Sequence, residues 1–107
     1  MKSSLQEFLD TLQDEGPPPA ESHLLDSVWY GLKGSWDRAH EIAQDDSGID
    51  AALIHAWLHR IKGDLVNAGY WYRQARREMH GGDTRAEGEA IAEELLSRAR
   101  GENGKTS

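Results

Sequence analysis

The sequence has 107 residues, of which 37% are hydrophobic and 29% are charged, with a formal net charge of −7 and no cysteine. A chain of this length makes one domain with a modest core, and the lack of cysteine excludes disulfides, thiolate zinc sites and cysteine nucleophiles. The negative charge argues against nucleic acid as a partner, because the phosphate backbone is also negative. Residues 1–5 carry no long apolar run, so we expect no signal peptide, no membrane span and a cytoplasmic protein.

The first predicted helix is amphipathic and lies within residues 1–15. Ser4 and Glu7 have the spacing of a capping box at its start, and the proline-rich segment 16–19 ends it. We expect this helix to pack on the rest of the chain as a cap, because a lone short helix is rarely stable in water. Binding of a partner is the alternative. The large apolar residues of this first helix recur at the spacing of one helical face: Leu5, Phe8, Leu9 and Leu12.

The central residues 21–77 predict two helix-turn-helix hairpins. Each of the four helices has an apolar stripe at helical spacing. The first helix covers about residues 20–33 and ends at Gly34, the second ends at residues 45–48, the third ends at Gly63, and the fourth continues to about Met79. The residues in position to cap the later three helices are Ser35, Ser47 and Asp64.

A weaker sixth helix is predicted over residues 84–100. Thr84 and Glu87 have the spacing of a second capping box. The tail 101–107 is polar and rich in glycine, so we expect it to be disordered. Residues 1–100 are therefore predicted to form a single all-α domain of five or six short helices.

The two predicted hairpins repeat one sequence pattern. Three pairs of residues coincide when the turns are aligned: Lys33 with Lys62, Gly34 with Gly63, and Ala39 with Ala68. Glycine permits a tight turn, and a small alanine lets two helices approach closely. Such a repeat, which cannot bury its own apolar face, is typical of stacked helical pairs.

Residues 63–75, with the sequence GDLVNAGYWYRQA, resemble the second half of a tetratricopeptide or Sel1-like repeat. Residues 34–39 match the same pattern more weakly. The resemblance covers roughly residues 21–77 and implies a tetratricopeptide-like array. The segments 36–44 and 55–60 also resemble a group of short, uncharacterised bacterial proteins, which implies a family without implying an activity.

His55 and His59 stand four positions apart on a predicted helix and therefore share one face. Two histidines at that spacing bind divalent metals such as zinc in known sites, and His40 on the preceding helix could supply a third ligand. Ala56 replaces the glutamate that a zinc-protease motif would have. The alternative is that these histidines are boundary residues hydrogen-bonded to neighbouring helices. Oxygen ligands could come from Asp26, Glu41 or Tyr72.

The polar side chains of the central helices predict a groove for a peptide or protein partner. We therefore favour a non-catalytic protein-interaction or scaffold module that needs no cofactor. The alternative is a metal-binding protein or metal-dependent enzyme that uses the three histidines and a divalent metal such as zinc. A homodimer could complete the short stack, with Val66 and Tyr70 as the exposed self-association surface. The residues expected at the groove are His40, Gln44, His55, His59, Tyr72 and Arg73.

Overall fold

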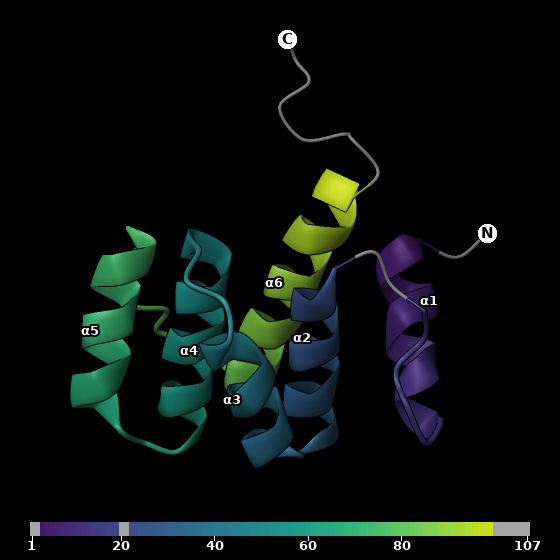
Figure 1. The fold of residues 1–107 in the computed structure, drawn as a ribbon, viewed down its shortest axis with the longest axis horizontal. Helices are drawn as coiled ribbons and strands as arrows, with labels where there is room; N and C mark the ends of the chain where they lie inside the picture. Colours follow the sequence, from purple (N-terminus) through teal and green to yellow (C-terminus); the bar gives the residue numbers. More distant parts are fainter. Residues whose placement is uncertain (1–2, 20–21, 100–107) are drawn as a thin grey trace, which may run out of the picture.

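The computed structural model describes residues 3–19 and 22–99, and over these residues the chain is all-helical, without any β-strand (Figure 1). This confirms the predicted all-α class. The predicted helix start at Ala20 and the predicted disordered tail 101–107 lie outside the described residues. In chain order the elements are α1 (Ser4–Asp10), the 3-10 turn η1 (Thr11–Gln13), α2 (His23–Lys33), α3 (Trp36–Gln44), α4 (Ile49–Ile61), α5 (Leu65–Ala75) and α6 (Thr84–Ala99).

The helix pairs α2–α3 and α4–α5 form the two hairpins, and each turns at a glycine with a left-handed backbone. The φ angle is 94° at Gly34 and 79° at Gly63, a region that other residues enter only with strain. Asp64 caps α5, because its carboxylate accepts a hydrogen bond from the backbone N–H of Asn67 at 3.3 Å. The repeated Lys-Gly turn of the sequence therefore corresponds to the same backbone bend in both hairpins.

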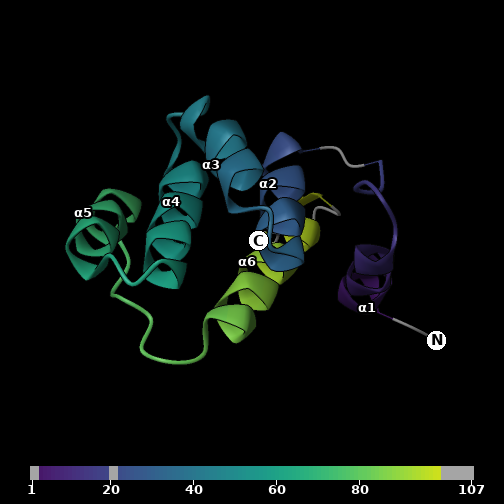
Figure 2. The ribbon, with the colours of Figure 1, turned by 90° about the horizontal axis from the view of Figure 1, so that it is seen from below.

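The hairpins pack through α3 and α4, and α6 closes the other side. Figure 2 shows α3 and α6 on opposite sides of the pair formed by α2 and α4. Helix α5 lies at one end of the array against α4, and α1 lies at the other end. Over the described residues, none of the helices is long and apolar enough to cross a bilayer. Three apolar side chains of α5 are exposed: Leu65, Val66 and Tyr70. Val66 and Tyr70 are the two residues expected at a self-association surface.

Trp57 fills the space between α4, α2 and α6. Its side chain is fully buried, and the indole N–H donates to the carbonyl of Thr84 at 2.7 Å. A methyl group on Gly31 of α2 would lie 2.6 Å from the ring, and one on Gly88 of α6 would lie 2.4 Å from it. Both glycines are therefore required by the close approach of the indole.

Helix α1 packs on α6, and the segment after it, from Thr11 to Asp14, is tied to α2 by polar contacts. Phe8 of α1 is buried, and the indole N–H of Trp29 donates to the Thr11 hydroxyl at 3.0 Å. The Lys33 ammonium donates to the carbonyl of Asp14 at 2.8 Å. The N-terminal segment therefore packs as a cap on the end of the array.

Several helix ends differ from the predicted ones by one to four residues, whereas α2 ends before Gly34 and Asp64 caps α5, as predicted. The N-cap of α1 is Ser3, whose hydroxyl accepts from the Gln6 N–H, and the N-cap of α4 is Gly48. Asp83 accepts from the Ala86 N–H at the start of α6. Helix α5 ends at Ala75 because the next residue takes a left-handed conformation with φ 62°. Several cap-forming residues are adjacent in this sequence, and spacing alone does not choose between them.

Candidate metal centre

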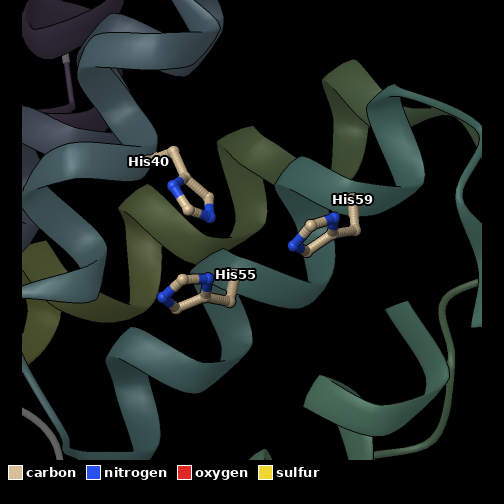
Figure 3. Close-up of side chains that lie close together, drawn as sticks. All are labelled: His40, His55 and His59. Carbon is tan, nitrogen blue, oxygen red and sulfur yellow. The ribbon is translucent and has the colours of Figure 1, made fainter. Parts of the chain in front are cut away.

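Three histidines meet where the two hairpins pack. His40 extends from α3, and His55 and His59 extend from α4, one helical turn apart. Each ring offers one nitrogen, and these three nitrogen atoms all lie within 4.8 Å of one another. Figure 3 shows one nitrogen of each ring facing the shared space between the helices.

Two indole rings hold two of these imidazoles in place. His40 stacks on Trp36 with ring centroids 4.9 Å apart, and His55 stacks on Trp71 with centroids 4.1 Å apart. The Trp36 N–H donates to the Leu58 carbonyl at 2.6 Å, which fixes that indole on α4. Stacking on the indoles therefore orients His40 and His55, and neither ring makes a hydrogen bond to a neighbouring helix within the described residues.

The Nδ1 atom of His55 is buried and has no hydrogen-bond partner in the described part of the chain. The His55 side chain as a whole is only 5% exposed. Leaving such an atom unsatisfied costs about 1–3 kcal/mol, and native proteins rarely keep one without a ligand, ion or water. This nitrogen is the strongest single indication that the cluster accepts something from outside the chain.

The surroundings favour the neutral form of two of these imidazoles, His40 and His55. Burial lowers the pKa of His55 to about 4, with further lowering by the neighbouring His40 and His59. Burial also lowers the pKa of His40, with a smaller contribution from His59. A neutral imidazole has a free lone pair, which is the form that binds a metal.

Asp64 supplies a carboxylate behind His59. The Nδ1 atom of His59 lies 3.8 Å from a carboxylate oxygen of Asp64. That same oxygen accepts a hydrogen bond from the Asn67 side-chain amide at 2.7 Å. With Nδ1 turned toward Asp64, the Nε2 atom of His59 is left for the cluster. A carboxylate on this side of the ring stands where the outer partner of a metal-binding histidine stands, although 3.8 Å is longer than a hydrogen bond.

A cavity of about 480 Å³ opens onto the histidines. Its wall is mixed. The side chains of Trp71, Ile49 and Ala52 are apolar, and amide, hydroxyl and carboxylate side chains line other parts. A space of this volume accepts a small molecule or a few residues of a peptide. The polar side chains that line it beside the histidines include Gln44, Ser47, Asn67 and Gln74.

Four of the six residues expected at the groove line this cavity: His40, Gln44, His55 and His59. Tyr72 and Arg73 do not. Consecutive helical residues point about 100° apart, so Trp71 faces the cavity while Tyr72 faces α6 and Arg73 is exposed. Of the oxygen ligands considered, Asp26 and Glu41 also lie outside the lining, and Glu41 pairs with Arg38 at 3.2 Å.

Tyr72 belongs to a second polar cluster, which we call the closed cluster and define as Arg60, Tyr72 and Glu87. The Tyr72 hydroxyl donates to the Glu87 carboxylate at 2.5 Å, and the Arg60 guanidinium donates to its other oxygen at 3.0 Å. Arg60 also donates to the Gly82 carbonyl at 2.8 Å. Glu87 is 3% exposed, and burial together with Glu87 raises the pKa of Tyr72 above its ordinary value. This cluster was not predicted from the sequence, because the spacing of Glu87 is that of a capping residue.

Comparisons with protein-family models, curated proteins and solved structures find no match to this chain. What the cavity and the histidines do is therefore inferred from their geometry and chemistry.

Proposed function

We propose that this protein binds a divalent transition-metal ion of the zinc type through His40, His55 and His59. The observation that carries the proposal is the convergence of three imidazoles around one space, with a buried Nδ1 that lacks a partner among the described residues. Zn–N bonds of about 2.0–2.1 Å in a tetrahedral site separate the ligand nitrogens by roughly 3.4 Å. Metal binding would therefore draw the three nitrogens, which now lie within 4.8 Å of one another, closer together.

The ligand set argues for the class of metal. Three nitrogen donors suit zinc, copper, nickel or cobalt, whereas calcium and magnesium prefer oxygen ligands. The outer carboxylate of Asp64 behind His59 is the usual companion of a metal-binding histidine. Zinc is the ion we propose, because three histidines with an open fourth position are an established zinc ligand set.

The metal would join the two hairpins, because His40 comes from α3 and the other two ligands come from α4. Binding to the folded chain alone stabilises it by RT ln(1 + [metal]/Kd), about 2.7 kcal/mol at a hundredfold excess over Kd. Three protein ligands leave a fourth position, which in this proposal faces the cavity. A position of this kind serves ligand binding or catalysis, whereas a purely structural zinc has four protein ligands.

The test is zinc titration of protein purified without a histidine tag, followed by calorimetry and by thermal unfolding. We expect one zinc per chain and a raised Tm, both lost in His40→Gln and His59→Gln. The matched control is His80→Gln, because His80 lies in the loop before α6 and takes no part in the cluster. Absence of zinc binding, with an unchanged Tm in excess zinc, would overturn the proposal.

A second candidate function uses the same cavity without a metal. In this version the protein is a non-catalytic scaffold that holds a short peptide or partner segment. The support for it is the cavity volume of about 480 Å³ and its polar lining. Peptide binding that persists in the chelator-treated protein and in His59→Gln would favour the scaffold over the metal protein.

A further inference from the structure

A divalent metal held by three neutral imidazoles keeps its full charge of +2. The carboxylates near the cluster are engaged elsewhere. Asp46 lines the cavity, but one of its oxygens accepts from the Gly48 N–H at 2.7 Å and the other lies 3.0 Å from His23. Asp64 is bonded to Asn67 and stands behind His59 rather than in front of it. An incoming anion is therefore the ligand that would neutralise the ion best.

The cavity wall carries amide and hydroxyl groups that can donate hydrogen bonds to a ligand. Gln44, Ser47 and Gln74 all line the cavity, and within the described residues none of them makes a side-chain hydrogen bond. Gln44 stands one helical turn from His40 on α3, and Gln74 lies on α5 at the opposite wall. Amide and hydroxyl groups donate to a carboxylate oxygen without adding charge.

Another part of the wall is apolar. Trp71 stacks on His55, and Ile49 and Ala52 also line the space. A bare inorganic anion would leave these surfaces in contact with water, whereas a ligand with a short carbon body would cover them. The combination of one cation, neutral donors and an apolar wall fits an organic acid.

From this arrangement we infer that the fourth position of the metal takes a carboxylate, either from a small organic acid or from the C-terminus of a short peptide. The inference rests on the proposed metal function and gives it a ligand class. The carboxylate oxygen would bind the metal, Gln44 and Gln74 would donate to the second oxygen or to the body of the ligand, and Trp71 would cover its carbon atoms.

The experiment uses the full chain loaded with Co²⁺, whose visible absorption reports its coordination. Acetate is titrated first, with its neutral isostere acetamide and with chloride at equal ionic strength as controls. We expect acetate alone to change the spectrum saturably. A second arm compares the dipeptide alanylalanine with its C-terminal amide. Binding of the dipeptide at least tenfold tighter than acetate, and lost on amidation, identifies a peptide terminus, and equal affinity identifies a small acid.

Variants test whether the wall takes part. Gln44→Ala and Gln74→Ala are expected to weaken acetate binding about three- to tenfold while leaving Co²⁺ binding unchanged. Gln13→Ala is the matched control, because Gln13 is exposed in η1, which packs on α2 away from the cavity. Equal responses to acetate, acetamide and chloride, or no response to any of them, would overturn the carboxylate inference but leave the proposed metal function standing. Failure of the chain to bind Co²⁺ or Zn²⁺ at all would overturn the metal function itself.

Discussion

The closed cluster and the histidine cluster both use side chains of α4, on different faces of that helix, and they satisfy their polar atoms in different ways. In the closed cluster, Glu87 receives a hydrogen bond on each oxygen, from Tyr72 and from Arg60. In the histidine cluster, Nδ1 of His55 has no partner within the described residues. The closed cluster joins α6 to α4 and α5. The histidine cluster leaves an unpartnered nitrogen between α3 and α4, where the two hairpins pack.

This difference separates a polar group that stabilises a fold from one that is available for a ligand. Buried hydrogen bonds are strong in a medium of low dielectric constant, and a missing partner is costly in the same medium. Under the proposed function, the missing partner of the histidine cluster is the metal ion, whereas the closed cluster needs no ligand. Four changes to the protein or its solvent test this contrast.

The largest effect is expected from removing the acid of the closed cluster. Glu87→Ala leaves the Arg60 guanidinium and the Tyr72 hydroxyl buried without their partner, which should lower the free energy of unfolding by about 3–5 kcal/mol. Urea unfolding of the wild type and the variant measures this decrease in the free energy of unfolding. Glu89→Ala, two positions along α6, removes only a surface pair with Arg85 and should change stability by less than about 1 kcal/mol. Equal losses in the two variants would show that the closed cluster contributes no special stability.

Acid should destabilise the metal-free protein through His55. The pKa of His55 is about 4 in the folded chain, against 6.5 for an unperturbed histidine, so between these values the unfolded chain holds more protons. The stability that neutral His55 contributes is fully present above about pH 6.5. As the pH falls to about 4, the free energy of unfolding decreases by roughly 2–3 kcal/mol.

Chemical unfolding of the wild type and of His55→Leu at several pH values measures this contribution. The carboxylates titrate in both proteins, so the difference between the two profiles isolates His55. Identical profiles would contradict the buried neutral imidazole.

A methyl group at Gly88 should disturb the α6 contact without affecting the histidines. The added carbon would lie 2.4 Å from the buried Trp57 ring, and overpacking of this kind costs about 1–3 kcal/mol. Gly69→Ala on α5 is the matched control, because its new methyl group meets only flexible side-chain ends at 3.7 Å. We expect a lowered Tm for Gly88→Ala alone, with zinc affinity unchanged in both. A loss of zinc binding in Gly88→Ala would show that the two faces of α4 are not independent.

The smallest effect is expected from the carboxylate behind His59. Asp64→Asn keeps a residue that caps α5 well but removes the negative charge 3.8 Å from Nδ1 of His59. Loss of such an outer partner weakens metal binding by about tenfold or more. Zinc competition titrations measure the change, and stability without metal should stay within about 0.5 kcal/mol. An unchanged Kd would mean that Asp64 serves only as a cap.

Local features of the structure could be predicted from the sequence, because they depend on neighbours along the chain. Gly34 and Gly63 end helices by their own backbone freedom, and the spacing of His55 and His59 puts both on one face of whatever helix contains them. The all-α class follows from the same kind of pattern. These inferences require no knowledge of which helices meet.

Contacts between distant segments could not be predicted in this way. Periodicity shows that Trp71 and Tyr72 face different directions, but not which of them faces the cavity. Glu87 has the spacing of a capping residue, yet α6 docks so that this side chain reaches Arg60 and Tyr72. The position of α6 against α2 and α4 depends on the fit of Trp57 between two glycines, and no local pattern encodes that fit.

If the three histidines bind a metal as proposed, their placement on two helices, one on α3 and two on α4, has a kinetic consequence. Neither hairpin alone contains more than two of the three histidines, so an ion could leave only by shedding bonds one at a time or when the hairpins separate. The lifetime of a bound ion would then follow the opening rate of the seam between α3 and α4. The rate of metal exchange would thus report how often α3 and α4 separate, a motion that equilibrium binding does not detect.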